Sequence, residues 1–339
     1  MIELKNKLFA LSGADGIGNI REASDLACEM LSDHCECEKK TDNLTVIGFL
    51  KGESDYTLML DAHIDQIGMV VTNIDENGFL TVKNAGGIDI RCLPSRRVTV
   101  HGKEKITAVF CSTPPHLAEG DTVFKNIEEI KLDTALGKKA KDIVSIGDYV
   151  TFANTPKELI GNRVSGRSFD NRSAVACLIS VAEKLKDKKL PVNVAFVLSD
   201  SEELGLRGIR TASFKVNPDE AIAVDVSFGD GPGISGEECS PLGSGAMIGM
   251  SPTLDTAISK KLIAICERKK IKYTSEVIGG KTGTNADMIS VNREGVRTGT
   301  LSIPLRNMHT DTEVVDLADL QSVCDALCEY VLSGGAKNA

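Results

Sequence analysis

The second half of the chain alternates apolar runs typical of strands with segments of helical periodicity, and this alternation constrains the fold more than any other feature. The strand-like runs cover residues 192–200, 221–227 and 298–305, and the helical patterns cover residues 173–187, 255–270 and 317–333. Strands that alternate with helices favour an α/β domain, in which helices cover a mostly parallel central sheet. We therefore predict a three-layer α/β domain.

The first half of the chain contains two different patterns. Residues 19–33 place apolar side chains at helical spacing, and residues 44–50 and 56–65 are typical of two adjacent strands. From residue 68 onward, short β-rich pieces alternate with Gly, Pro and Asp turns, which favours a small β-barrel or sandwich. The predicted division is a first part of the α/β domain at 1–67, an inserted small β-barrel domain at 68–161, and the second part of the α/β domain at 162–339.

Composition limits the partners that this chain can have. Its 39 Lys and Arg against 48 Asp and Glu give a formal net charge of -9, which disfavours nucleic acid and anionic membranes as partners. The absence of Trp and an aromatic content of 4% argue against a carbohydrate-stacking cleft. No apolar run reaches the length of a signal-peptide core or a membrane span, and the ten cysteines are scattered, so we expect a cytoplasmic protein with reduced thiols.

Histidine and carboxylate side chains gather where the predicted strands end. The candidates are His63, Asp65, Asp170, Glu202, Glu203, Asp225 and His309. Loops at the carboxyl ends of parallel strands form the sites of open α/β sheets, so these side chains are expected to meet. Imidazole and carboxylate groups together suit divalent ions such as Zn, Co or Mn. A carboxylate that bridges two such ions lets the pair activate one water for hydrolysis.

Glu202 and Glu203 place two like charges side by side, which a metal site explains. Adjacent residues at a strand end point in different directions, so one can bind metal while its neighbour acts as general base. Each candidate also has an ordinary interpretation: His63 as a buried histidine, the glutamates as a solvated strand end, and Asp65 as a turn residue or as the group that orients His63. Asp225 lies inside an apolar run, where an unpaired carboxylate is costly, and the set together favours a metal site.

Two further segments leave alternatives open. Residues 34–37, His-Cys-Glu-Cys, fit an ordinary polar connection after a helix or half of a soft-metal site. Residues 279–287, GGKTGTNAD, lack the first glycine of a phosphate-binding loop, because Ser275 stands there. This second segment is either a glycine-rich wall near the metal site or a flexible turn.

A series of motifs runs along nearly the whole chain in a fixed order: LDAHIDQIGMVV, AGGIDIRCLPSRRVTV, STPPHL, IGDYVTF, SFDNRSA, SEELGLRG, AVDVS, GPGI, GTNAD, and IPLRNMH followed by EVVD. Together they resemble the M42 metallo-aminopeptidases, a family of glutamyl and related aminopeptidases. The resemblance implies two metal sites, made of His63 and Asp225, of Glu203 and His309, and of Asp170 as the bridge. It further implies Glu202 as general base, Asp65 as the carboxylate that orients His63, and a cis peptide bond between Asp170 and Asn171.

The resemblance also implies a function and an assembly. The predicted enzyme is a cytosolic two-metal aminopeptidase that removes N-terminal residues from short peptides, with a hydroxide between two Zn or Co ions as nucleophile and Mn as an alternative metal. Its inserted domain is expected to be PDZ-like and to form dimers that assemble into a dodecamer. The alternatives are a metal-dependent deacylase of small N-acyl substrates, a glycosidase of the endoglucanase type, and an inactive metal-bound assembly protein. Gln66, Asn171 and Asn307 depart from the family pattern and leave the substrate preference open.

Overall fold

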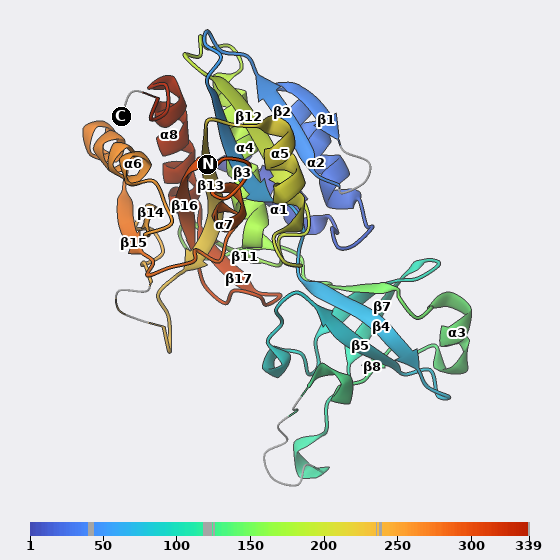
Figure 1. The fold of residues 1–339 in the computed structure, drawn as a ribbon. Helices are drawn as coiled ribbons and strands as arrows, with labels where there is room; N and C mark the ends of the chain where they lie inside the picture. The colour runs from blue at the N-terminus through green and yellow to red at the C-terminus, as the bar shows by residue number, and fades with distance from the viewer. Residues whose placement is uncertain (40–43, 118–123, 125, 235, 237–238, 338–339) are drawn as a thin grey trace.

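The computed structural model describes the whole chain except residues 40–43, 118–123, 125, 235, 237–238 and 338–339 (Figure 1). An eight-stranded mixed sheet forms its centre, in the order β1-β2-β12-β3-β13-β16-β14-β15. These strands are β1 (Glu36–Lys39), β2 (Val46–Leu50), β3 (Thr57–His63), β12 (Asn193–Ser199), β13 (Glu220–Phe228), β14 (Ala246–Met250), β15 (Tyr273–Val277) and β16 (Arg297–Leu305). The four central strands β12, β3, β13 and β16 run parallel, which confirms the predicted mostly parallel centre.

Helices cover both faces of this sheet and give the three predicted layers (Figure 1). On one face lie α1 (Ile2–Gly13), α2 (Glu22–Ser32), α4 (Phe169–Leu185), α6 (Thr256–Lys269) and α8 (Leu317–Leu332), and on the other lie α5 (Arg207–Val216) and α7 (Ala286–Ile289). Side chains alternate between the two faces along each strand, so Leu58 and Leu60 of β3 pack on the first layer and Met59 packs on the second. Along the part of the chain that the structure describes, none of the helices is long and apolar enough to span a bilayer.

Helix α4 is buried along almost its whole length, because it packs between the sheet and the helices α1 and α8. Asp170 and Asn171 at its beginning have backbone angles outside the helical range, so the regular helix starts after them, near the predicted start. The peptide bond between these two residues is cis, as the resemblance implies. The helix therefore brings the Asp170 carboxylate to the edge of the sheet.

The segment between the two parts of the sheet folds into a closed antiparallel barrel, in the order β4-β5-β8-β7-β6-β9. Its strands are β4 (Gly68–Ile74), β5 (Leu80–Ala85), β6 (Arg97–His101), β7 (Lys105–Phe110), β8 (Leu132–Asp133) and β9 (Tyr149–Phe152). Short helices accompany it: Ile90–Cys92, Pro115–Leu117, Ile127–Glu129, Gly137–Lys139 and α3 (Ala140–Ile143). The barrel has an apolar core of its own, and Figure 1 shows it projecting from the α/β domain.

A small three-stranded sheet lies where the chain returns from the barrel. It consists of β10 (Lys157–Glu158), β11 (Arg163–Gly166) and β17 (Glu313–Asp316). The register pairs Gly166 at the end of β11 with Glu313 at the start of β17. This pairing places the segment before α4 beside the segment that follows β16.

Candidate active site and metal centre

The seven predicted site residues meet at one end of the central sheet. His63 ends β3, Asp65 follows it, Asp170 begins α4, Glu202 and Glu203 lie between β12 and α5, Asp225 belongs to β13, and His309 follows β16. All of them except Asp65 line a single cavity of about 510 Å³. The expected meeting of strand-end side chains is therefore present in the fold.

The two oxygens of the Asp170 carboxylate face two different imidazoles. Oδ1 lies 3.0 Å from Nε2 of His63, and Oδ2 lies 3.3 Å from Nε2 of His309. Beyond them, Asp225 Oδ1 lies 3.7 Å from His63 Nε2, and Glu203 Oε1 lies 3.4 Å from His309 Nε2. Asp170 is thus central, with one histidine and one further carboxylate on each side.

Asp65 lies behind the cavity wall, next to the His63 ring. Its carboxylate accepts hydrogen bonds from the backbone N–H groups of Glu202, at 2.9 Å, and Glu203, at 3.2 Å. Its Oδ1 also lies 3.4 Å from Nδ1 of His63, on the opposite side of the ring from Asp170. One buried carboxylate therefore lies beside the imidazole and bonds to the backbone of the loop that carries the two glutamates.

Burial and mutual repulsion act strongly on the charges of this cluster. Burial lowers the pKa of His63, but Glu202, Asp170 and Asp65 outweigh burial and raise this pKa well above its ordinary value. Hydrogen bonds to Asp170 and Glu203 raise the pKa of His309 to about 11. Burial, with repulsion from Glu203, raises the pKa of Glu202 to about 8. Burial and like charge thus disfavour several carboxylate anions here, and a bound cation would favour them.

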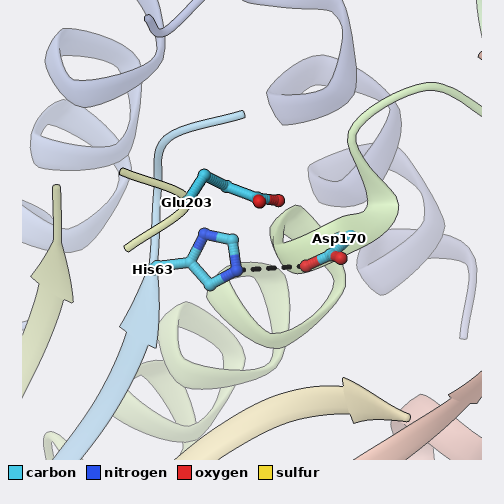
Figure 2. Close-up of side chains that lie close together, drawn as sticks. All are labelled: His63, Asp170 and Glu203. Carbon is cyan, nitrogen blue, oxygen red and sulfur yellow. Dashed lines mark hydrogen bonds and ion pairs between the residues drawn. The ribbon is translucent and has the colours of Figure 1, made fainter. Parts of the chain in front are cut away.

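The donor set fits divalent metal ions. Figure 2 shows the side chains of His63, Asp170 and Glu203 pointing toward one another, and one ligand atom from each lies within 4.8 Å of the others. Imidazole nitrogen with carboxylate oxygen is a combination that binds Zn, Co and Mn. Asp225 and His309 extend this set on its two sides. The residues present therefore match a metal centre in type and in placement.

Glu313 is a buried part of the site that the sequence did not indicate. Its carboxylate accepts hydrogen bonds from the backbone N–H groups of Phe169 at 2.7 Å, Asp170 at 3.2 Å and His309 at 3.0 Å. The residue is only 1% exposed, so these three bonds satisfy a carboxylate that is almost fully shielded from solvent. Glu313 thereby links the backbone segments of two predicted metal ligands.

A second buried network anchors the glycine-rich segment at residues 279–287. Asn285 Nδ2 donates to Asp61 Oδ2 at 2.7 Å and to Ser199 Oγ at 2.8 Å. Burial raises the pKa of Asp61 to about 7. Asp61 is two residues before His63 on β3, so the network connects the segment to the strand that carries a predicted ligand.

The same segment forms a wall of the cavity. Thr282, Gly283 and Thr284 line it, and the Asp287 carboxylate accepts the backbone N–H groups of Thr282, at 2.9 Å, and Gly283, at 3.2 Å. Of the two interpretations of this segment, the arrangement matches a glycine-rich wall near the metal site. The small side chains there leave room for a ligand beside the histidines.

The His34–Cys37 segment gathers no comparable set of ligands. The Sγ atoms of Cys35 and Cys37 lie 3.7 Å apart. In the described part of the chain, however, no third His, Cys, Asp or Glu joins this pair at a distance suited to a shared metal ion. The structure therefore gives no support to a soft-metal site here.

Comparison with known proteins places the chain in a family. The model of the M42 glutamyl aminopeptidases matches residues 45–325. The lysyl aminopeptidase of Pyrococcus furiosus is 30% identical, over 94% of this chain and 93% of its own length. The solved structure of an aminopeptidase from the archaeon Desulfurococcus kamchatkensis has 30% identity and a TM-score of 0.90, and the match covers 98% of this chain and 95% of that one.

A third similar protein is known for its assembly. The Pyrococcus horikoshii TET1 peptidase, which can assemble into a tetrahedron or a large octahedral shell, has 27% identity and a TM-score of 0.85. The match covers 97% of this chain and 99% of that one. Since the family model and a 30% identical relative both span most of the sequence, the chain is a peptide hydrolase that belongs to the M42 family of glutamyl aminopeptidases.

Proposed function

We propose that this protein is a two-metal aminopeptidase that removes N-terminal residues from short peptides. The observation that carries the proposal is Asp170, whose two oxygens face His63 and His309 at 3.0 Å and 3.3 Å. His63 and Asp225 would hold one ion, Glu203 and His309 would hold the other, and Asp170 would bridge them. When bound, two divalent ions, Zn or Co with Mn as an alternative, polarise the scissile carbonyl and acidify the attacking water.

Glu202 serves as the general base in this proposal. It lines the cavity, and its Oε2 lies 4.0 Å from His63 Nε2, so it is near the ligands without being placed between the two histidines. Glu202 accepts a proton from the attacking water and returns it to the leaving amine. Asp65, through the backbone of Glu202, keeps the carboxylate at the cavity wall.

Selectivity for the end of a peptide follows from the charge of the cavity. A free α-amino group is a cation at neutral pH, and the cavity is lined by the carboxylates of Asp170, Glu202, Glu203 and Asp225. Pairing of the α-amino group with one of these carboxylates would hold the first peptide bond beside the metal ligands. An internal peptide bond has no such cation and would not be positioned in this way.

The test uses protein stripped with a chelator and reconstituted separately with Zn, Co and Mn. Initial rates on aminoacyl p-nitroanilides are expected to return only with metal. Parallel assays on N-acyl amino acids and on a soluble cellulose derivative cover the deacylase and glycosidase alternatives. Hydrolysis of N-acyl amino acids alone would replace the aminopeptidase by a deacylase, and metal binding without any turnover would indicate an inactive assembly protein.

The glycosidase alternative fits the geometry poorly. A glycosidase needs two carboxyl groups about 5–9.5 Å apart on either side of a sugar ring, and it has no need of histidines. Here Asp170 and Glu203 converge with His63 within 4.8 Å, so the carboxylates share a centre instead of flanking a substrate. Release of sugar in the presence of a chelator would nevertheless contradict the proposal of a metal-dependent aminopeptidase.

We also propose self-association through the inserted barrel, as dimers that build a dodecamer. The support is the structural similarity to the TET1 peptidase and the exposure of apolar side chains on the barrel, with Ile146 70% and Val109 39% exposed. Mass photometry of the wild type and of Ile146→Asp tests this. A wild type that is monomeric at micromolar concentration would contradict it.

A cytoplasmic location is a further part of the proposal. Each of the ten cysteines is free in the structure, which suits a reducing compartment. Cell fractionation followed by thiol labelling of the isolated protein tests this, and recovery of a disulfide-linked form from outside the cell would contradict it.

A further inference from the structure

One carboxylate behind the wall of the cavity has no part in the proposed metal centre. Glu276 is the second-last residue of β15 and lies three positions before the glycine-rich segment, part of which lines the cavity. Ser227 Oγ donates a hydrogen bond to Glu276 Oε1, and Ser302 Oγ donates to Oε2 at 2.9 Å. Ser227 itself lines the cavity, so the Glu276 carboxylate lies immediately behind this part of the wall.

The position of Glu276 follows from the sheet. Asp225 and Ser302 are register partners on adjacent strands, and Ser227 is two residues after Asp225 on β13. Residues two apart on a strand share a face, so Ser227 and Ser302 point to the same side of the sheet as the predicted ligand Asp225. Glu276, which bonds to both serines, therefore lies on the same side of the sheet as Asp225.

Within the described part of the chain, the Glu276 carboxylate has no counter-ion. Among the described residues, no Lys, Arg or His nitrogen lies within 4.0 Å of its carboxylate. A carboxylate can accept about four hydrogen bonds, and the two serines supply two neutral ones. Burial raises the pKa of Glu276, since a half-enclosed anion without a cation is poorly solvated. Among the described residues, Glu276 therefore bonds only to neutral groups.

The remaining wall near Ser227 matches a long cationic side chain. Val226, Phe228 and Leu206 contribute apolar surface to the cavity, and Thr282 and Thr284 contribute hydroxyl groups from the glycine-rich segment. The methylene stem of a lysine or arginine packs on apolar surface while its charged end bonds to a carboxylate and hydroxyl groups. An acidic side chain in the same place would lie beside Glu276 and be repelled.

We propose that Glu276 is a specificity-determining residue that selects substrates with lysine or arginine at the N-terminus. The inference rests on the proposed aminopeptidase function and adds the class of side chain that the enzyme takes. Ser227 is a positioning residue in this arrangement, because its hydroxyl joins the cavity to the Glu276 carboxylate. The bound cation supplies the missing positive group.

The experiment measures kcat and KM on the lysyl, arginyl, leucyl and glutamyl p-nitroanilides with the metal-reconstituted enzyme. Lysyl and arginyl substrates are expected to have the highest kcat/KM and the glutamyl substrate the lowest. In Glu276→Gln, the ratio of kcat/KM for lysyl over leucyl substrate is expected to fall by about 10- to 100-fold, mainly through KM, because a charged hydrogen bond is lost. The exposed Glu294→Gln is the matched control and should leave this ratio unchanged.

Three outcomes separate the proposals. If no p-nitroanilide is hydrolysed with any metal, the aminopeptidase function itself fails. If the wild type prefers leucyl or glutamyl substrates, the function stands and the specificity proposal is overturned. If Glu276→Gln lowers kcat/KM for all four substrates by the same factor, Glu276 is structural and does not select the substrate.

Discussion

The Asp65 carboxylate accepts a 2.9 Å hydrogen bond from the backbone N–H of Glu202. Asp65, two residues after the end of β3, therefore bonds to the backbone of the residue proposed as base on a different loop. In Asp65→Asn, an amide NH2 group replaces one acceptor oxygen. The hydrogen bond from the backbone N–H of either Glu202 or Glu203 is therefore lost. We expect kcat to fall by about 10- to 100-fold and metal affinity to weaken. Kinetics at saturating metal check this, with the exposed Asp142→Asn as control.

Variants of Glu202 and of Glu203 should have different effects, one on turnover and the other on metal binding. Glu202→Gln is expected to keep both ions and to lose about 10²- to 10⁴-fold in kcat, because the amide cannot accept the proton of water. Glu203→Gln is expected to lose metal, because it removes a charged ligand beside His309. Metal analysis by mass spectrometry and turnover measured on the same samples distinguish the two. Near-normal turnover of Glu202→Gln would remove its assignment as base.

Glu313→Gln tests whether the backbone around Asp170 and His309 needs the buried carboxylate. An amide offers one acceptor oxygen where the carboxylate offers two, so at least one of the three backbone N–H groups loses its partner. We expect the free energy of unfolding, measured with denaturant, to fall by about 1–3 kcal/mol. Cobalt titration should also show weaker binding of one ion. Unchanged cobalt binding in a destabilised variant would limit Glu313 to folding.

The contact of Asn285 with Asp61 permits a reciprocal exchange. Asn285→Asp alone places two carboxylates 2.7 Å apart in a buried site, and we expect a loss of about 3 kcal/mol in stability. Adding Asp61→Asn restores one amide and one carboxylate and should recover most of this loss. Denaturant unfolding of both single variants and the double variant completes the cycle. Additive effects would show that the two side chains do not interact.

Removal of metal should destabilise the protein reversibly. Without cations, the buried carboxylates of Asp170, Glu202 and Glu203 repel one another. Metal at about 100 times its dissociation constant stabilises a site by about 3 kcal/mol. We therefore expect chelator to lower the melting temperature and Zn or Co to restore it. In Glu203→Gln, the effect of chelator should be smaller, and an equal effect would contradict the placement of Glu203 in the centre.

Elements with strong local signals could be predicted from the sequence. The apolar runs at 44–50, 56–65, 221–227 and 298–305 correspond to β2, β3, β13 and β16, because buried strands need continuous apolar residues. The edge strand β15 is half exposed and carries no such run, and it was not predicted. Helix α1 was also missed, although Leu4, Leu8 and Leu11 form a buried stripe on it. The predicted domain limits and site roles stay predictions.

The residues that were missed in the site act through contacts distant in sequence. Glu313 bonds to the backbone of Asp170 from 143 residues away, and Asn285 reaches Asp61 across 224 residues. Neither has a spacing that points to its partner. The strand-end histidines and carboxylates could be found because parallel strands bring their ends together whatever their distance along the chain. Supporting contacts depend instead on side-chain packing that one sequence does not reveal.

Both connections to the barrel leave the α/β domain at nearly the same point. Gly68 begins the barrel shortly after His63, and Gly166 ends the return path shortly before Asp170, whose carboxylate lies 3.0 Å from the His63 ring. A segment whose two ends are this close can be enlarged, shortened or exchanged without moving the strands on either side. In the proposed assembly, evolution can therefore alter how subunits join through the barrel while the chemistry of each subunit is preserved.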